Sequence, residues 1–588
     1  MQDRLSKLRK RMQRAGIDAY LMPMSDFHGS DALGERFQGI RYLTGFTGSA
    51  GTLVVTPNEA ALFTDGRYFL QAAQQLANTG VDLYCLGEPG VPTAVEFLLE
   101  RLQENGALGF DGRALYGFDA LLKPLEKKGI SFRFEEDLLD GVWTDRPKAP
   151  LGKAYFLDPC YAGEPAREKL KRVRQAMAER GGKSYLIAAP DDIGWLLNLR
   201  GADLRRTPLA LCYLLLELEH AYLFLDRRKT DEAFREHLTG LGVELLPYES
   251  VWGVLKKYAV GPMLLDPQRV SYALYHSVAD GLEKRHVEQL TMPMKWIKNA
   301  VERNNLRKAN VKDGVAMVRF LHWLKRNVAE HRITERTAAE RLEEYRREQG
   351  CVDLSFDTIC AYGPHGAIVH YCATPETDAE LAPKGLLLLD SGGQYLTGTT
   401  DVTRTIALGR LTKAQKRSFT LVLKGMIGLA RAKFPEGCTG ANLDALARGP
   451  LWQQGLDYNH GTGHGIGYFS CVHQDPYRFV HYRQSPPIPL LEGMVGSDEP
   501  GVYFEGSYGV RIENDLLVKR EADTPFGRFL AFETLTLCPI DLTAVDAALL
   551  NEEERAWLNG YHKRVFEALA PHLEAEEAAW LKRNTREI

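Results

Sequence analysis

The sequence predicts a mixed α/β (α+β) fold, with two related N-terminal α/β modules followed by a larger C-terminal domain. The stretch RLSKLRKRMQRAGIDAYLM (4–22) recurs in altered form as KLKRVRQAMAERGGKSYLI (169–187). Each copy has the pattern of an amphipathic helix, a glycine that ends it, and an apolar strand. After residue 300 the pattern changes to a long amphipathic helix and then to apolar strands that carry acidic residues. A chain of 588 residues is long enough for two to four domains.

The two copies define the predicted N-terminal modules, 1–150 and 151–290. A shift of 165 positions aligns Leu5 with Leu170, Met12 with Met177, Gly16 with Gly181, and Tyr20 with Tyr185. Further along, IRYLTG (40–45) resembles IGWLLN (193–198), and LFTDGR (62–67) resembles LFLDRR (223–228). Chance similarity between helix–strand patterns is the alternative explanation. The stretch TDRPKAPLGK (144–153), with two prolines and mixed charge, is typical of a linker between the modules.

The third predicted domain covers 291–588 and begins with TMPMKWIKNAVERNN (291–305). Apolar residues then recur at helical spacing and predict a long amphipathic helix: Val311, Val315, Val318, Leu321 and Leu324. Near the C-terminus, EEERAWLNGYHKRVFEALAPHL (552–573) predicts another amphipathic helix. Its apolar face could pack on its own domain or against a second subunit.

Composition and charge exclude several classes of function. The chain is 45% hydrophobic and 26% charged, as in soluble globular proteins, and its formal net charge is -4. Nothing in this balance suggests a nucleic-acid or membrane surface, and no apolar run approaches the roughly 20 residues that span a bilayer. The nine cysteines are scattered, with no Cys-x-x-Cys pair, which favours a reducing compartment. We therefore expect a cytoplasmic protein.

Four carboxylates and a histidine in the third domain suggest a metal site. The stretch GLLLLDSGGQYLTGTTDVTRTIAL (385–408) predicts two apolar strands joined by a glycine-containing loop. The expected ligands lie at the start or end of apolar strands and follow in the order Asp390, Asp401, His464, Glu499 and Glu513. A single such carboxylate is more often a turn former or a surface charge. Together, the five suit two divalent cations about 3.5–4 Å apart, with some carboxylates bridging. Oxygen-rich ligation with one nitrogen favours Mn²⁺, Co²⁺, Fe²⁺ or Zn²⁺.

The stretch HGTGHGIGYFSCVH (460–473) contains three histidines and four glycines, and two explanations are open. The histidines could serve a metal site, or they could simply be packed side chains in a glycine-rich loop. Glycine would let the main chain pass close to metals and substrate. We expect His464 to be the nitrogen ligand.

Five motifs, in this order, resemble the catalytic domain of the Xaa-Pro aminopeptidases: DSGGQY, GTTDVTRT, HGTGHGIG, DEPGVY and RIEN. That family belongs to the pita-bread metallopeptidases. Upstream, FTGSAGTLVV (46–55), FTDGRYFLQAA (63–73) and DDIGWLLNLRG (191–201) resemble the two creatinase-like N-terminal domains of the long form. The C-terminal tail also resembles that long cytosolic form. The resemblance covers nearly the whole chain and implies a pita-bread catalytic domain and a homodimer.

The resemblance also implies roles for individual residues. Asp390 would bind one metal, His464 with Glu499 the other, and Asp401 and Glu513 would bridge both. Glu499 would also carry a proton to and from a bridging water that attacks the substrate. The implied cofactor is two divalent metal ions, most readily Mn²⁺, with Zn²⁺ or Co²⁺ as alternatives.

The implied pocket residues lie around these ligands. The catalytic pocket would be lined by His370, His460 and His473. Substrate-binding positions would be Arg67, Tyr503 and Arg511. The sequence departs from the family at VHQDP (472–476), where Gln474 and Asp475 replace the usual Glu and Gly, and at HYCATPET (370–377). Both departures lie beside pocket histidines, so they leave metal binding untouched and put the fine substrate preference in doubt.

The expected substrates are peptides with proline at position two. A bond to proline has no N–H, and a two-metal site does not need one, because it acts on the carbonyl and the attacking water. Two alternatives remain. One is a prolidase that acts only on Xaa-Pro dipeptides. The other is a non-catalytic pita-bread module that binds proteins, which the complete ligand set and the lack of an acidic tail argue against.

Overall fold

The computed structural model describes residues 1–480 and 487–588, apart from the side chains of 475–477. The chain divides into two compact units, Met1–Lys295 and Trp296–Ile588. Within the first unit we keep 1–150 and 151–290 as the proposed division. None of the helices in the described part of the chain combines the length and apolar character that crossing a bilayer requires.

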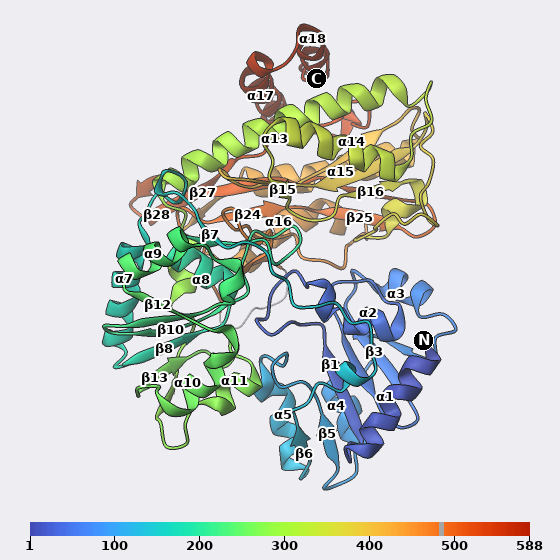
Figure 1. Ribbon diagram of the computed structural model, residues 1–588. Coiled ribbons are helices and arrows are strands. Elements are labelled where there is room, and N and C mark those ends of the chain that lie inside the picture. Colours follow the sequence, from blue (N-terminus) through green and yellow to red (C-terminus); the bar gives the residue numbers. More distant parts are fainter. Residues whose placement is uncertain (481–486) are drawn as a thin grey trace. The chain divides into compact units, whose positions relative to one another are not determined.

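The first module contains a six-stranded sheet in the order β4-β3-β2-β1-β5-β6. Strands β1, β3, β5 and β6 of this sheet are labelled in Figure 1. The central strand β1 runs antiparallel to β2 and parallel to β5. The strands are β1 (Ala19–Pro23), β2 (Thr52–Val55), β3 (Ala60–Thr64), β4 (Asp82–Cys85), β5 (Ala107–Gly109) and β6 (Ser131–Arg133). The helices are α1 (Gln2–Arg14), α2 (Gly39–Thr44), α3 (Phe69–Gln75), α4 (Ala94–Arg101) and α5 (Phe118–Lys127).

Both faces of this sheet are covered, which explains why its central strands β1, β2 and β3 are mostly apolar. Side chains alternate between the faces of a strand. Tyr20 of β1 packs with the apolar stripe of α1, which includes Leu5 and Leu8. Its neighbour Leu21 packs on the other face in the cluster that holds Phe97 of α4 and Leu122 of α5. The sheet therefore lies between two helical layers.

The second module repeats this topology, with the order β12-β11-β10-β8-β13-β14. Here β8 runs antiparallel to β10 and parallel to β13, as β1 does to β2 and β5. The strands are β8 (Ser184–Ile187), β10 (Tyr213–Glu217), β11 (Ala221–Phe224), β12 (Val243–Leu246), β13 (Met263–Leu265) and β14 (Lys284–His286). The helices are α7 (Ala166–Glu179), α8 (Pro190–Leu197), α9 (Glu232–Gly240), α10 (Val251–Lys257) and α11 (Tyr272–Ser277). The predicted pair of α/β modules is confirmed.

The second unit packs its central strands between helices. The helices are α13 (Ala300–Asn327), α14 (Glu335–Glu348), α15 (Lys413–Ala430), α16 (Gly440–Trp452), α17 (Glu552–Leu569) and α18 (Ala575–Asn584). Strand β17 (Leu386–Ser391) pairs antiparallel with β16 (Ile359–Tyr362) and β20 (Val402–Ala407). A second sheet has the strand order β21-β28-β27-β24-β22-β23. Its strands are β21 (Lys433–Pro435), β22 (Gly463–Gly465), β23 (Gln474–Phe479), β24 (Val495–Asp498), β27 (Asn514–Thr524) and β28 (Gly527–Thr534). Strands β25 (Gly501–Phe504) and β26 (Tyr508–Arg511) pair with each other.

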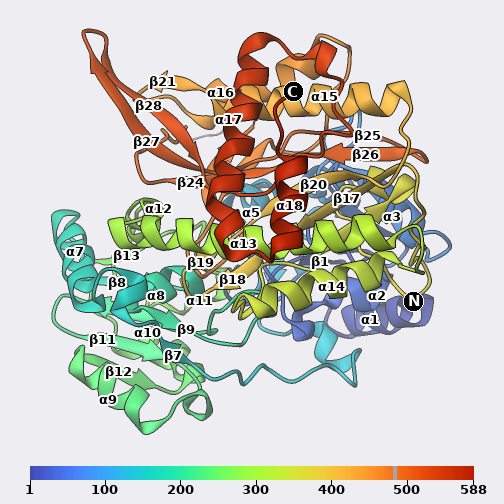
Figure 2. The same cartoon turned by 90° about the horizontal axis from the view of Figure 1, so that it is seen from above.

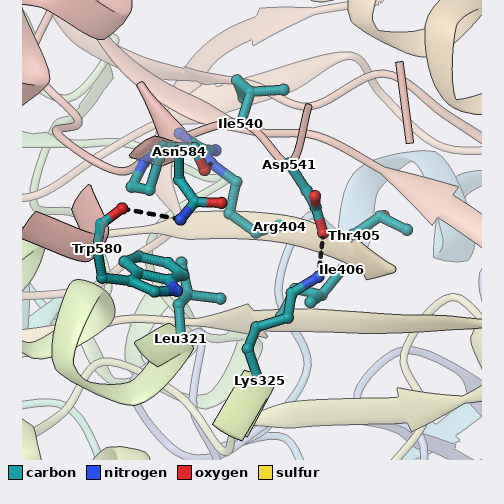
Figure 3. A pocket seen from close by; sticks show the side chains of 10 residues that line it. Leu321, Lys325, Arg404, Thr405, Ile406, Ile540, Asp541, Trp580 and Asn584 are labelled. Atoms are coloured by element: carbon teal, nitrogen blue, oxygen red, sulfur yellow. Dashed lines mark hydrogen bonds and ion pairs between the residues drawn. The ribbon is translucent and has the colours of Figure 1, made fainter. Parts of the chain in front are cut away.

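The predicted C-terminal helix packs on its own unit. In Figure 2, α17 and α18 lie side by side across α13. Tyr561 and His562 of α17 are buried, and His562 Nε2 accepts a hydrogen bond from Ile540 N–H at 3.0 Å. Trp580 of α18 lines a small pocket with Leu321 and Lys325 of α13 (Figure 3). These contacts bury the apolar face that the sequence predicts.

Candidate active site

Two paired strands deliver the first two carboxylates. Asp390 lies in β17 opposite Thr403 of β20, and Asp401 immediately precedes β20. Leu389, the neighbour of Asp390, packs on the helical face against α13 and α14. Because side chains alternate along a strand, Asp390 faces the opposite way, as do Asp401 and Thr403. The apolar pattern of these strands thus places both carboxylates on one interior face.

His464 lies in the short strand β22, where a β-bulge interrupts the pairing with β23 between His464 and Gly465. The His464 Nδ1 lies 3.0 Å from Gly465 O, so Nδ1 donates and Nε2 keeps its lone pair. The Nε2 atom lies 3.6 Å from Asp401 Oδ2 and 3.8 Å from Glu499 Oε1. A Cβ at Gly463 would lie 1.9 Å from Ser497 O, so this close approach of two strands requires glycine.

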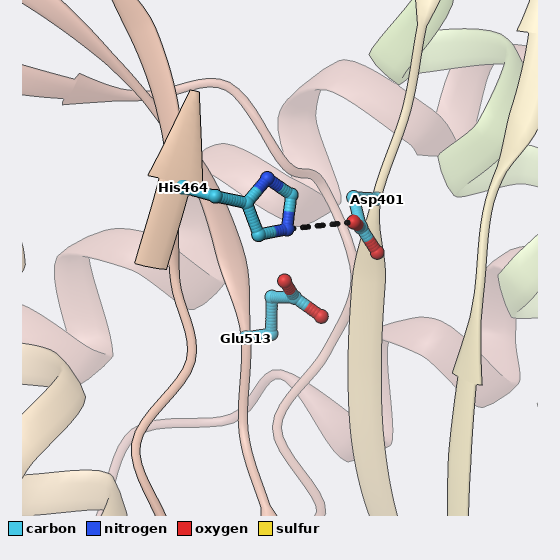
Figure 4. A group of neighbouring side chains, drawn as sticks. All are labelled: Asp401, His464 and Glu513. Carbon is cyan, nitrogen blue, oxygen red and sulfur yellow. Dashed lines mark ion pairs between the residues drawn. The ribbon is translucent and has the colours of Figure 1, made fainter. Parts of the chain in front are cut away.

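Glu513, between β26 and β27, completes a cluster with Asp401 and His464. One donor atom from each residue lies within 4.8 Å of the others, and the three side chains converge from separate segments (Figure 4). Thr403 donates its hydroxyl to Glu513 Oε2 at 2.6 Å, which fixes that carboxylate. Glu499 follows β24, and its N–H donates to Thr462 O at 2.7 Å.

The electrostatics of this cluster fit a bound cation. Burial, together with neighbouring Glu513 and Asp390, raises the pKa of Asp401 well above its ordinary value. Burial, together with Asp390 and Glu499, likewise raises the pKa of Glu513. The buried Oδ1 atoms of Asp390 and Asp401 have no hydrogen-bond partner among the described residues. Converging carboxylates with unpartnered oxygens are costly unless a cation joins them, so the donor set fits divalent metal.

A chain of hydrogen bonds runs from Asp390 to His460. Arg511 is buried and donates to Asp390 Oδ2 at 2.6 Å and to the Tyr503 hydroxyl at 2.9 Å. The Tyr503 hydroxyl lies 2.8 Å from His460 Nε2, while His460 Nδ1 lies 2.7 Å from Gly461 O. Burial raises the pKa of Tyr503 to about 12, although Arg511 opposes this, so the phenol stays protonated and can donate to His460.

The other two predicted histidines lie near the same residues. The rings of His473 and His464 meet edge to face, with centroids 4.4 Å apart. His473 is exposed. His370 is half-buried, and the carbonyl of its neighbour Val369 accepts a hydrogen bond from Arg511 at 3.3 Å. His473 thus lies beside His464, and the main chain next to His370 is joined to Asp390 through Arg511, while the pocket roles of these histidines stay predictions.

Arg67 lies in the first unit, far in the sequence from the other predicted site residues. Its guanidinium makes a two-pronged ion pair with Asp65, at 2.8 and 2.7 Å. Gln474 is buried and accepts a hydrogen bond from Lys298 Nζ at 3.1 Å. The side chain of Asp475 lies outside the described residues. The effect of Gln474 and Asp475 on substrate preference therefore stays a prediction.

Sequence reasoning missed two residues that support the ligands. Thr403 holds Glu513, and the alternation of DVTRT, which puts Asp401 and Thr403 on one face, could have identified it. Asp515 is buried, and its Oδ2 accepts the Asp401 N–H at 3.2 Å. The sequence carries no signal for Asp515, because its partner lies 114 positions away.

Comparison with known proteins agrees with this arrangement. Residues 304–520 match the model of metallopeptidase family M24, and 528–588 match the C-terminal region of peptidase M24. Residues 4–131 and 145–302 each match a creatinase/prolidase N-terminal domain. Aminopeptidase P2 of Arabidopsis thaliana is 39% identical, and the match covers 100% of this chain and 88% of the relative. The chain belongs to the Xaa-Pro aminopeptidases of family M24.

Further members of the family support the assignment. A probable Xaa-Pro aminopeptidase P of Laccaria bicolor is 38% identical, over 99% of this chain and 92% of the relative. The crystal structure of an X-prolyl aminopeptidase from Caenorhabditis elegans is 35% identical, with a TM-score of 0.95. That match covers 100% of this chain and 99% of the other, which is described as a cytosolic enzyme with a di-nuclear active site. The expected resemblance and fold class are confirmed.

Proposed function

We propose that this chain is a metal-dependent aminopeptidase that removes the first residue from peptides with proline at position two. The observation that carries the proposal is the convergence of Asp401, His464 and Glu513, whose donor atoms lie within 4.8 Å of one another. Asp390 and Glu499 extend this set to five. Full-length similarity to Xaa-Pro aminopeptidases supplies the substrate class.

Five residues would hold two divalent cations, with Asp390 on one, His464 and Glu499 on the other, and Asp401 and Glu513 shared. Mn²⁺ suits this oxygen-rich set with one nitrogen, and Zn²⁺ or Co²⁺ are alternatives. When bound, such a pair acidifies water and polarises the scissile carbonyl.

The side chains then handle protons and orientation. Glu499 accepts the proton of the attacking water on its carboxylate and returns it to the leaving proline nitrogen. Arg511 orients Asp390 by the 2.6 Å contact and reaches His460 through the Tyr503 hydroxyl. His460 is thereby held as one tautomer that faces the pocket.

Three further residues complete the proposed roles. His473, beside His464, donates a hydrogen bond to the oxyanion that forms at the scissile carbonyl. His370 contacts the substrate from the segment that Arg511 holds at Val369. Arg67 is the third of these residues, with a proposed role in substrate binding.

The competing function is that of a prolidase. The Xaa-Pro dipeptidase from Bacillus anthracis is 25% identical, with a TM-score of 0.51, and its match covers 64% of this chain. The full-length relatives are instead named aminopeptidases, and their matches span both N-terminal modules. We therefore favour the aminopeptidase, and propose that it works in the cytosol as a homodimer, as the long form of the family implies.

The test is a peptide panel assayed with metal-stripped protein to which Mn²⁺ is added. The panel pairs each tripeptide or longer peptide that begins Xaa-Pro with the dipeptide Xaa-Pro and with an Xaa-Ala analogue. We expect metal-dependent cleavage of the longer Xaa-Pro peptides and weak or no cleavage of Xaa-Ala. Efficient hydrolysis of the dipeptides alone would instead establish a prolidase.

A further inference from the structure

A buried arginine on α16 holds the loop that leads into β22. Residues 456–462 form neither helix nor strand, so their main-chain carbonyls need partners from elsewhere. Arg448 supplies them: it donates to Tyr458 O at 2.8 Å and to His460 O at 2.6 Å. Its side chain is only 1% exposed.

The same guanidinium is held by two carboxylates and an aromatic ring. Arg448 Nε donates to Asp444 Oδ2 at 2.7 Å, one turn away on α16, and a terminal nitrogen donates to Asp457 Oδ1 at 2.7 Å. Its central carbon lies 3.8 Å from the centroid of the Tyr458 ring. Asp444 is fully buried, so the planar fork of arginine is fixed on both sides.

Asp444 extends this support to the ligand Glu499. The second oxygen of Asp444 accepts the Thr462 hydroxyl at 2.5 Å. The Thr462 carbonyl in turn accepts the Glu499 N–H at 2.7 Å. A continuous set of bonds therefore joins the ion pair on α16 to the main chain at His460 and at Glu499.

We infer that the buried ion pair of Arg448 and Asp444 is a positioning pair for the reaction, because it fixes the loop 457–462. The inference rests on the proposed function. Both side chains act through the loop: Arg448 binds its main-chain carbonyl at His460, and Asp444 binds the side-chain hydroxyl of Thr462. Outer partners of this kind typically contribute 10- to 100-fold to metal affinity or activity.

The test compares Arg448→Met with a matched control, Arg346→Met. Arg346 of α14 is fully buried and makes a two-pronged ion pair with Asp313 of α13, at 2.9 and 3.1 Å. It is as buried as Arg448 and also pairs with a buried carboxylate, but its side-chain partners lie on α13 rather than in 457–462. We expect both variants to lose thermal stability. Only Arg448→Met should lower kcat on Arg-Pro-Pro by about tenfold or more, with a smaller change in KM.

Metal binding gives a readout that does not depend on turnover. Mn²⁺ is titrated calorimetrically into metal-stripped wild type and both variants. We expect about tenfold weaker binding of one cation in Arg448→Met and wild-type binding in Arg346→Met. If the methionine variants do not fold, Arg448→Lys and Arg346→Lys replace them. Lysine keeps the charge but loses the fork, so Arg448→Lys should still lower kcat.

A further variant isolates the link to Glu499. Thr462→Val removes the hydroxyl that Asp444 holds but keeps the carbonyl that accepts the Glu499 N–H. We expect kcat to fall in this variant, as it does in Arg448→Met. Wild-type kcat, KM and Mn²⁺ affinity in a folded Arg448 variant would overturn the inference. A wild type that cleaves no Xaa-Pro peptide would instead refute the proposed function.

Discussion

The guanidinium of Arg511 lies 2.6 Å from Asp390 Oδ2, and both side chains are buried. Oδ2 of Asp390 thus pairs with the positively charged side chain of Arg511, while the buried Oδ1 of Asp390 has no hydrogen-bond partner among the described residues. This division orients Asp390 so that Oδ1 can serve a metal. The other terminal nitrogen of Arg511 donates a hydrogen bond to the Tyr503 hydroxyl, and this hydroxyl in turn contacts His460 Nε2.

The Tyr503 hydroxyl is predicted to matter for turnover. Tyr503→Phe keeps the ring but removes the group between Arg511 and His460. A hydrogen bond to a charged group contributes about 1.5–3 kcal/mol, which corresponds to a fall in kcat/KM of roughly ten- to a hundredfold. Tyr508→Phe is the control, because its hydroxyl pairs with Ser418 at 3.1 Å instead. Equal kcat/KM values for Arg-Pro-Pro in the two variants would contradict the role of Tyr503.

Asp401 is predicted to serve both metals. Asp401→Asn replaces a charged bridging carboxylate with a neutral amide, so metal content should fall at both sites and turnover should be lost. The measurement is elemental analysis after dialysis, with Asp266→Asn as the control. Asp266 is a buried carboxylate of the first unit, bonded to the N–H groups of Gln268 and Gln289. Full metal content and normal turnover in Asp401→Asn would show that Asp401 is not a ligand.

Local patterns predict the two modules and the strand that carries the proposed ligand Asp390. The recurrence of 4–22 at 169–187 identifies α1–β1 and α7–β8, because each copy carries its own apolar stripe and helix stop. The leucines before Asp390 likewise predict β17.

Pairing between distant segments escapes such patterns. The loop expected between β17 and β20 contains two short paired strands, β18 (Gly393–Tyr395) and β19 (Gly398–Thr399). The glycine-rich stretch around His464 is a strand because β23 and β24 flank it. Arg448 carried no signal, since its partners are main-chain carbonyls of a loop whose path only the fold determines.

Acid is predicted to destabilise the fold through buried neutral histidines. Burial, with Arg404 and Arg586, lowers the pKa of His562 to about 3, and burial lowers that of His28 to about 4. Between these values and the ordinary pKa of about 6.5, only the unfolded chain binds the extra proton. The contribution of these two histidines to the free energy of unfolding is therefore fully present above about pH 6.5. It falls as the pH drops, by up to about 1.4 kcal/mol per pH unit for each histidine.

The check is urea unfolding at pH 7 and pH 5. His562→Gln should lower the unfolding midpoint at pH 7, where it loses packing, but should show a smaller drop between the two pH values than wild type. The exposed His331 provides the control His331→Gln, which should behave as wild type. An unchanged pH dependence in His562→Gln would remove His562 from the explanation.

Assembly is predicted from the family alone. We expect light scattering at micromolar concentration to give a mass near twice the 66.0 kDa of one chain. The apolar face of α17 packs within its own unit, so α17 offers no apolar face to a second subunit. A mass of one chain under these conditions would remove the homodimer from the proposal.

Product analysis of Arg-Pro-Pro shows whether the enzyme removes a single residue before proline. The Mn²⁺-loaded protein is incubated with Arg-Pro-Pro, with its N-acetylated form, with Arg-Ala-Pro and with the dipeptide Arg-Pro, and the products are identified by mass spectrometry. We predict Arg and Pro-Pro from the first peptide, no cleavage after acetylation because the charged amine is lost, and a much lower kcat/KM when alanine replaces the second residue. Efficient hydrolysis of Arg-Pro with no action on Arg-Pro-Pro would contradict the proposed aminopeptidase activity and identify a prolidase.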